Sequence, residues 1–518
     1  MAGRKFYVTT PIYYVNDVPH IGHAYTTIAT DVIARYRRLK GDDILFLTGT
    51  DEHGQKVEKS AEVIGLQPIE LADQVVERFK GLWEKLNISN NDFIRTTERR
   101  HKEAVHHLWR VVKERGDIYL GSYEDWYCTP CETFWTEKQL LEGKCPDCRR
   151  EVDRLQEPSY FFRMSRYQER LLKHIEENPD FIQPESRRNE IVSFVREGLR
   201  DLSISRTTFQ WGVHVPDDPE HVVYVWFDAL TNYLTAAGYP GEMPYWPADI
   251  HLIGKDILRF HAVYWPTFLM AAGLPLPKRV FAHGWWTVEG QKMSKSVGNV
   301  VDPNDMVDRF GLDQFRYFLM AGVPFGQDGD FSIKTFIERV NSNLANDLGN
   351  LLSRTLAMID KYYEGAIPTL PDDAWREGGT VDTAREIQLR RVVENGTGDD
   401  YNAYMEGLRF SLALAKVWDI IGDANRSIED TAPWTLWKEK KLEKLSVTLY
   451  TLAESLRIVA VYLYPFIPHS AQEIWRQLGI EGEIGDTTLD EAVKWGGLQE
   501  GTAIARGKPL FPKVETEV

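Results

Sequence analysis

The first 48 residues carry a strand–helix–strand pattern, and this pattern limits the chain to a small set of folds. Residues 5–10 are predicted to form a buried strand that Pro11 ends, and residues 44–48 a second strand. Between them, apolar residues recur at helical spacing from Ile21 until Gly41, where the helix is expected to stop. Such a unit makes the two strands parallel, and ligands then bind beyond their carboxyl ends. Two segments are expected in that crevice: residues 20–23 and 49–54.

The remaining chain predicts a second half of the same sheet and then a helical region. Residues 249–253, 257–270 and 279–283 have the patterns of a strand, a helix and a strand. They complete a Rossmann-type, doubly wound parallel α/β sheet. Beyond about residue 331 long helical repeats predict an all-α C-terminal helical bundle.

Length and charge restrict the class of protein further. A chain of 518 residues with 43% hydrophobic residues is expected to form two to four domains. Its net charge of −16 argues against general coating of nucleic acid, so any RNA contact must be local. No segment approaches the roughly 20 apolar residues of a membrane span, and no apolar signal core begins the chain. We therefore expect a cytoplasmic protein with no membrane partner.

All four cysteines lie in one C-x₂-C-x₁₃-C-x₂-C pattern, formed by Cys128, Cys131, Cys145 and Cys148. Two close pairs of thiolates are typical of a tetrahedral Zn²⁺ site, and we expect one ion per chain. Four thiolates leave no position for water, so the zinc is expected to be structural. The alternative is a pair of local disulfides, which are rare in cytoplasmic proteins because the cytoplasm is reducing.

Two short motifs offer candidate chemistry. The H-I-G-H motif at residues 20–23 stands where the first helix begins, and free backbone N–H groups attract anions there. Gly22 permits close approach of a flat ligand, and the flanking histidines can donate to phosphate oxygens or simply cap the helix. The K-M-S-K-S motif at residues 292–296 places two lysines on a polar loop. They either neutralise a polyphosphate or form an ordinary solvated surface.

In this order the two motifs resemble the signatures of class I aminoacyl-tRNA synthetases. Further segments resemble the methionyl-tRNA synthetase family over nearly the whole chain: T-P-I-Y-Y at 10–14, T-G-T-D-E-H-G at 48–54, Y-V-W-F-D-A at 224–229, I-G-K-D-I at 253–257 and F-A-H-G-W at 281–285. The resemblance implies activation of L-methionine with ATP to methionyl-adenylate and pyrophosphate. Methionine would then be transferred to the 3′ end of tRNA(Met), including initiator tRNA. It also implies Mg²⁺ bound with the ATP.

The resemblance assigns the nucleotide site to residues of both motifs and of the second half-sheet. The catalytic residues would be His20, His23, Lys292 and Lys295. The ATP-binding residues would be His20, Gly22, His23, Gly254, Asp256 and Lys295. For Asp256 the alternative is a helix cap, because Asp is a favoured N-cap residue.

By the same resemblance, Asp51 would bind the substrate ammonium. The pocket for the methionine side chain would be lined by Pro11, Ile12, Tyr14, Trp226, Ala229, Leu230, Tyr233, Ile257 and His261. An aromatic pocket suits a thioether, since each sulfur–aromatic contact is worth about 0.3–1.5 kcal/mol. For each aromatic residue, plain core packing is the alternative.

In the helical region, Asn350 and Arg354 are four residues apart and share one helix face, and Trp434 follows Pro433 at a predicted helix start. The resemblance makes these three residues anticodon readers, with the ring stacked on a base. A core tryptophan and a solvated helix face are the alternatives. For Arg206, catalysis and a buried ion pair both remain open.

We divide the chain into five parts: residues 1–115 and 216–285 as the two halves of the catalytic domain, 116–215 as an insertion with the zinc knuckle, 286–330 as the K-M-S-K-S loop and linking region, and 331–518 as the anticodon-binding domain. Because the chain ends soon after the helical part, we expect a monomer.

Three other functions are considered: a cysteinyl-type or other class I synthetase, a small-molecule nucleotidyltransferase that shares the H-I-G-H signature, and a catalytically silent tRNA-binding or scaffold protein. The zinc insertion and helical region argue against the second, and the intact motif residues argue against the third.

Overall fold

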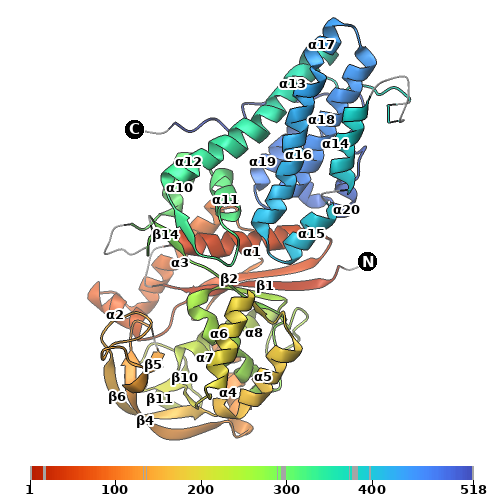
Figure 1. The fold of residues 1–518 in the computed structure, drawn as a ribbon. Coiled ribbons are helices and arrows are strands. Elements are labelled where there is room, and N and C mark those ends of the chain that lie inside the picture. The colour runs from red at the N-terminus through yellow and green to blue at the C-terminus, as the bar shows by residue number, and fades with distance from the viewer. Residues whose placement is uncertain are drawn as a thin grey trace. The chain divides into compact units, whose positions relative to one another are not determined.

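The computed structural model describes residues 3–15, 19–131, 133–135, 137–288, 290–292, 299–372, 374–375, 383–395 and 398–515. The chain forms two compact units (Figure 1). We call residues 5–30 and 44–283 the sheet unit, and residues 1–4, 31–43 and 284–518 the helical unit.

A parallel sheet forms the centre of the sheet unit, with strand order β3-β2-β1-β12-β13-β7 among the described residues. Its strands are β1 (Lys5–Tyr14), β2 (Asp43–Asp51), β3 (Asp92–Arg95), β7 (Ile182–Gln183), β12 (Ile250–Gly254) and β13 (Val280–His283). The chain reverses its direction of winding between β1 and β12, where a crevice for a ligand is expected at the carboxyl ends of the strands. The predicted doubly wound parallel α/β sheet is confirmed.

Pro11 does not end the first strand, so that prediction was wrong. Strand β1 runs through Pro11 to Tyr14. Its ladder with β12 pairs Val8 with Ile250 and Thr9 with His251, so Pro11 lies beyond these pairs. Proline disrupts a strand only where the ladder needs its missing N–H as a donor. Its fixed φ is compatible with the extended backbone at the end of a strand.

Helices surround this sheet within the sheet unit. They are the start of α1 (Ile21–Leu39), α2 (Gln55–Val63), α3 (Pro68–Lys85), α4 (Arg99–Glu114), α5 (Gln168–Glu177), α6 (Glu185–Arg196), α7 (Val225–Leu230), α8 (Asn232–Ala237) and α9 (Trp265–Ala272). The core includes the fully buried Tyr7, Trp109 and Trp265. The helix predicted over residues 257–270 is present in a modified form. It begins as the 3₁₀ turn η3 (Lys255–Ile257) and contains the π turn η4 (Phe260–Tyr264) before α9.

The cysteine-containing region is mostly antiparallel. Four strands in the order β5-β4-β6-β8 form one sheet, and three in the order β10-β11-β9 form another. The strands are β4 (Ile118–Cys128), β5 (Thr133–Trp135), β6 (Asp153–Phe162), β8 (Leu202–Ser203), β9 (Ser205–Arg206), β10 (His214–Val215) and β11 (Asp218–Val223). Strand β7, inside the predicted insertion, pairs instead with β13 of the parallel sheet. The five-part division of the chain stays a prediction.

The helical unit combines a small sheet with a helical bundle. Its strands are β14 (Trp286–Val288), β15 (Gln291–Lys292) and β16 (Gly329–Phe331). Its helices are α10 (Pro303–Phe310), α11 (Leu312–Ala321), α12 (Ile333–Arg339), η5 (Val340–Gly349), α13 (Asn350–Tyr363), α14 (Ala384–Asn395), α15 (Gly398–Glu406), α16 (Phe410–Thr431), α17 (Pro433–Lys438), α18 (Leu442–Leu463), α19 (Pro468–Gln477) and α20 (Leu489–Ala492).

Helices α13, α14 and α16 pack lengthwise against α18 or one another in this bundle (Figure 1). Helix α18 has 22 residues and is, among the described residues, the one helix long and apolar enough to cross a membrane. Its apolar segment is completely buried within the structure, so α18 is the core helix of the bundle. The predicted helical C-terminal region is thereby confirmed.

Candidate active site

The H-I-G-H motif occupies the chain between β1 and the first turn of α1. The rings of His20 and His23 stack with centroids 3.8 Å apart. The backbone N–H of His20 donates to Nδ1 of His23 at 3.1 Å, and the N–H of Gly22 donates to Nδ1 of His20 at 3.1 Å. A Cβ on Gly22 would lie 2.9 Å from Cε1 of His20, so a larger residue would displace this ring.

His23 is held as a neutral imidazole. Burial and the adjacent His20 ring lower the pKa of His23 well below its usual value. The ring also packs edge-on against Tyr13, at 4.8 Å, and Phe79, at 5.4 Å. Because its Nδ1 accepts a backbone hydrogen bond, the proton of the neutral ring is on Nε2. His23 can therefore offer an N–H donor to a ligand rather than a full positive charge.

The K-M-S-K-S motif is only partly within the described chain. Residues 293–298 lie outside it, so the prediction for Lys295 falls on a residue that the structure does not describe. Lys292 is the last residue of β15, and its backbone pairs with Thr287 of β14.

Gly254 and Asp256 lie together at the carboxyl end of β12. Gly254 is the N-cap residue of η3, so Asp256 does not cap this turn and the helix-cap alternative is wrong. A Cβ on Gly254 would lie 2.5 Å from Oδ1 of Asp256 and 4.0 Å from Cε1 of His283. His283 in turn contacts Oγ1 of Thr26 in α1 at 2.7 Å. This contact ties the helix that begins with the H-I-G-H motif to the strand beside Gly254.

The structure brings Trp226, Tyr233 and His261 together from α7, α8 and η4. Oη of Tyr233 lies 2.8 Å from Nε2 of His261, and Nδ1 of His261 lies 3.0 Å from the carbonyl oxygen of Ile257. Since a carbonyl only accepts, Nδ1 carries the proton and Nε2 accepts from Tyr233. Burial lowers the pKa of His261 to about 4, which keeps the ring neutral. Trp226 stacks on Phe260 at 3.7 Å.

Most of the other predicted pocket residues belong to the same hydrophobic core. Trp226, Leu230 and Tyr233 are members of one cluster, and three partly buried residues pack against it: Ile12, Tyr14 and Ile257. Pro11 and Ala229 are buried. Core membership alone does not assign a ligand, so the pocket assignment stays a prediction.

Asp51 is the last residue of β2 and is 3% exposed. Its carbonyl oxygen accepts a hydrogen bond from the N–H of Val15 at 3.3 Å. Asp51 therefore lies beside the end of β1, the strand that carries Ile12 and Tyr14. An ammonium group bound there would meet a carboxylate at an apolar wall.

The sequence analysis missed a buried His–Asp–His cluster behind this wall. Oδ2 of Asp228 lies 2.7 Å from Nδ1 of His53, and Oδ1 lies 2.6 Å from Nε2 of His101. Burial acts to raise the pKa of Asp228, but the two imidazoles hold it well below its usual value. The cluster ties α7, which carries Trp226, to the segment after β2. His53 and Asp228 lie in quoted motifs, whereas no local signal marks His101.

The four cysteines form one cluster. Their Sγ atoms lie within 4.8 Å of one another, with 3.5 Å between Cys128 and Cys148 and 3.9 Å between Cys131 and Cys145. None of the four is in a disulfide, so the disulfide alternative is wrong. A tetrahedral ion with bonds of about 2.3 Å requires sulfur atoms about 3.8 Å apart, which fits this donor set. The cluster could therefore hold a metal ion.

Arg206 is 1% exposed and packs over Tyr224, with Cζ 4.6 Å from the ring centroid. Its Nη1 donates to Oγ of Ser203 at 2.8 Å and to the carbonyl oxygen of Ser205 at 2.6 Å. These contacts give Arg206 a role in joining the small strands of the insertion.

The predicted anticodon readers are at the surface of the helical unit. Asn350 is exposed at the start of α13, and Trp434 is 46% exposed in α17. Nη2 of Arg354 lies 2.7 Å from Oε1 of Glu429, and both side chains are exposed. Exposed ion pairs are worth about 0–1 kcal/mol, so Arg354 can exchange this partner for another at low cost. The core alternative for Trp434 does not hold.

Comparison with known proteins identifies the family. Residues 6–157 and 151–356 match the family model described as tRNA synthetases class I (M). The chain belongs to the class I methionyl-tRNA synthetase family. A second model, the anticodon-binding domain of tRNA ligase, matches residues 395–500. Membership in the methionyl-tRNA synthetase family makes the chain an aminoacyl-tRNA synthetase, which is a ligase. It removes the cysteinyl-type and nucleotidyltransferase alternatives.

Curated and solved methionyl-tRNA synthetases are similar over almost the whole chain. The methionine–tRNA ligase of Caldanaerobacter subterraneus subsp. tengcongensis is 52% identical, covering 99% of this chain and 80% of the relative. That of Thermotoga maritima is 49% identical, covering 99% and 81%. The structure of Mycobacterium tuberculosis methionyl-tRNA synthetase in complex with methionyl-adenylate matches with a TM-score of 0.93 and 45% identity, covering 98% of this chain and 100% of that one. Its apo form matches with a TM-score of 0.87 and 43% identity, covering 99% of each chain.

Proposed function

We propose that this chain activates L-methionine with ATP to methionyl-adenylate and pyrophosphate, and then transfers methionine to the 3′ end of tRNA(Met), including initiator tRNA. The observation that carries the proposal is the group of side chains at the carboxyl ends of the central strands of the sheet unit. There, the stacked rings of His20 and His23 at a helix start, with His23 held neutral, accompany a buried aspartate and an aromatic wall. The match to a solved relative in complex with methionyl-adenylate supports the same ligand.

In the first step a carboxylate oxygen of methionine attacks the α-phosphorus of ATP. The bond from this phosphorus to the bridging oxygen of the β-phosphate breaks, and pyrophosphate leaves with that electron pair. His20 and His23 donate N–H groups to the phosphate oxygens, while Lys292 and Lys295 supply positive charge. Mg²⁺ bound with the ATP would further neutralise its phosphates. No protein nucleophile is needed, because the attacking carboxylate is already an anion.

In the second step a hydroxyl of the terminal tRNA ribose attacks the carbonyl carbon of methionyl-adenylate. The bond from this carbon to the phosphate oxygen breaks, AMP leaves with that electron pair, and the proton of the hydroxyl is released to water. Gly22, Gly254 and Asp256 bind the nucleotide in both steps.

Methionine is recognised at both of its ends. Asp51 binds the ammonium group. The thioether lies against the side chains predicted to line the pocket: Pro11, Ile12, Tyr14, Trp226, Ala229, Leu230, Tyr233, Ile257 and His261. The neutral His261 suits this apolar ligand, because a charged ring would have to be desolvated beside it.

The remaining assignments concern the metal and the tRNA. The four thiolates would hold one structural Zn²⁺ per chain, which their mutual distances support. Asn350, Arg354 and Trp434 read the anticodon, which the match of residues 395–500 to an anticodon-binding model supports. The protein acts as a monomer in the cytoplasm.

The test is exchange of labelled pyrophosphate into ATP, driven in turn by each of the standard amino acids. The proposal predicts that methionine supports exchange and that cysteine, isoleucine and leucine support little. Exchange driven best by another amino acid would contradict the substrate. If none of the amino acids supported exchange, the result would favour the catalytically silent alternative.

A further inference from the structure

Glu52 directly follows Asp51, and the protein engages its whole carboxylate. Glu52 is fully buried. Its Oε1 accepts from Oγ1 of Thr50 at 2.7 Å and from Nε of Arg95 at 2.7 Å. Its Oε2 accepts from Nη2 of Arg95 at 3.0 Å and from Oγ1 of Thr97 at 2.6 Å. Four donors fill the capacity of a carboxylate, so Glu52 has none left for a substrate.

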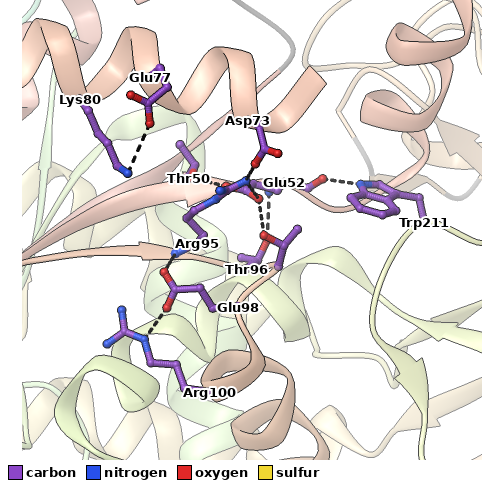
Figure 2. A network of polar contacts seen from close by, with 11 residues as sticks. Thr50, Glu52, Asp73, Glu77, Lys80, Arg95, Thr96, Glu98, Arg100 and Trp211 are labelled. Carbon is purple, nitrogen blue, oxygen red and sulfur yellow. Dashed lines mark hydrogen bonds and ion pairs between the residues drawn. The ribbon is translucent and has the colours of Figure 1, made fainter. Parts of the chain in front are cut away.

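The backbone of Glu52 is fixed as well (Figure 2). Its N–H donates to Oγ1 of Thr96 at 3.0 Å, and its carbonyl oxygen accepts from Nε1 of Trp211 at 2.6 Å. The next residue, His53, is bound to Asp228 at 2.7 Å. The chain immediately after Asp51 is therefore held at successive residues, by partners from separate elements.

Arg95 supplies the charge that makes this arrangement stable. The register of β2 and β3 places Arg95 opposite Thr50. Arg95 therefore lies on the strand next to β2, whose end Glu52 follows. Arg95 also pairs with Asp73 of α3, and Figure 2 shows it between the two carboxylates. Burial acts to lower the pKa of Arg95, but its bonds to Glu52 and Asp73 raise it well above its usual value. A buried Glu52 without this partner would be strongly unfavourable.

We propose that Glu52, held by Arg95, is a positioning residue that fixes the Asp51 carboxylate for the ammonium group of the amino-acid substrate. The inference rests on the proposed function, because it takes Asp51 as the ammonium ligand. A binding group that is already held in place loses little further freedom when the ligand arrives. Glu52 should therefore control affinity for methionine and leave affinity for ATP unchanged.

A double-mutant cycle in the full chain tests this inference by titrating L-methionine and ATP against each variant. Glu52→Gln keeps the shape of the side chain but places an amide N–H₂ against a group that itself donates. We expect methionine affinity to fall about tenfold, as for loss of one buried charged hydrogen bond, and ATP affinity to stay within about twofold. In the Asp51→Asn background, Glu52→Gln should add less than about a twofold loss, because the group that it positions is already impaired.

Arg100→Gln is the matched control. Arg100 lies on α4 close to Arg95 in the chain, is 43% exposed, and pairs with Asp92 at 2.7 Å. Because Arg100 is itself exposed and is not among the donors to Glu52, this variant should bind methionine normally. If Glu52→Gln does not fold, Thr97→Val replaces it, since it removes one donor to Glu52 without creating a buried charge. Thr97→Val should lower methionine affinity about threefold. ATP affinity should again stay unchanged, and the added loss in the Asp51→Asn background should again be smaller.

Each outcome separates the inference from the proposed function. Normal methionine affinity in Glu52→Gln, with impaired affinity in Asp51→Asn, would overturn the positioning role alone. Equal losses from Glu52→Gln in both backgrounds would also overturn it, because the effect would then be independent of Asp51. Normal affinity in Asp51→Asn itself would instead contradict the role of Asp51 as the ammonium ligand, the part of the proposed function on which the inference rests.

Discussion

Asp51 and His261 show how burial sets the chemistry of single residues in the sheet unit. Asp51 is almost completely buried, so a charged ligand that reaches it gains a strong interaction and little competition from water. His261 is buried and neutral, and its two ring nitrogens are fixed by Tyr233 and Ile257. These environments match the proposed roles, in which Asp51 binds the charged end of methionine and His261 lies beside its apolar end.

Asp51→Ala should strongly reduce methionine activation while the protein stays folded. The substrate ammonium would lose its carboxylate partner, and a charge-assisted hydrogen bond is worth roughly 1.5–3 kcal/mol. We therefore expect at least about a tenfold loss in methionine-dependent pyrophosphate exchange, with an unchanged melting temperature. Near-normal exchange in this variant would contradict the assignment of Asp51.

The pKa of His261 predicts a pH dependence of stability. Burial lowers the pKa of this residue to about 4 from 6.5, so between these values the unfolded chain binds more protons. The contribution of His261 to the free energy of unfolding is therefore fully present above pH 6.5. It decreases as the pH falls toward 4, by up to about 1.4 kcal/mol per pH unit. The melting-temperature difference between the unaltered protein and His261→Gln should therefore narrow as the pH falls. A difference that stays constant would show that His261 titrates normally.

At the scale of elements, local signals could be predicted from the sequence and non-local pairings could not. The cysteine cluster follows from spacing over a short segment, and the main strands and helices follow from hydrophobic periodicity. Strand β7 has only the residues Ile182 and Gln183, so it has no periodicity to detect. The continuation of β1 through Pro11 depends on where its ladder with β12 ends, which only the folded sheet determines.

In the candidate site, too, the residues with local sequence signals were predicted and those held by non-local contacts were not. Motif resemblance assigned roles to Asp51 and to the aromatic wall, and these assignments stay predictions, whereas it gave Glu52 and Asp228 no role. Their partners Arg95 and His101 come from β3 and α4, outside every quoted motif. Such support depends on tertiary contacts, and no spacing in the sequence encodes it.

The cysteine cluster should carry one zinc ion per chain. Metal analysis of the purified protein tests this directly, and Cys145→Ser, which removes a buried ligand, should lose the metal. Because a closed thiolate site contributes folding energy, hydrogen exchange should accelerate first in β4 to β6. Pyrophosphate exchange should change less than tRNA charging. Purified protein with no zinc and four reactive thiols would remove the site.

Trp434→Ala should separate amino-acid activation from tRNA charging. Trp434 is 46% exposed, so its loss should have little effect on the melting temperature. If the ring stacks on an anticodon base, charging should fall by roughly 5- to 150-fold while pyrophosphate exchange, which needs no tRNA, is retained.

Trp437→Ala is the matched control for this variant. Trp437 lies in the same helix, is 43% exposed, and stacks on Tyr362 at 5.0 Å. A specific role for Trp434 predicts a clearly smaller loss of charging in the control. Equal losses of both activities in Trp434→Ala, with a lowered melting temperature, would show that Trp434 acts in packing.

At the scale of the whole molecule, the two units carry separate parts of the chemistry. The predicted methionine pocket, the H-I-G-H motif and the cysteine cluster belong to the sheet unit. The K-M-S-K-S motif and the candidate anticodon readers belong to the helical unit. A net charge of −16 argues against general affinity of the chain for polyanions. We therefore expect tRNA to be recognised through local contacts, for which Trp434 and Arg354 are the proposed residues.

The most direct measurement is transfer of labelled methionine to tRNA(Met) in the presence of ATP. The account predicts that methionine becomes esterified to the 3′-terminal ribose of a transcript with a CAU anticodon. It also predicts that charging falls strongly when the anticodon bases are changed. No esterification of methionine, or equal charging of a transcript with an altered anticodon, would contradict it.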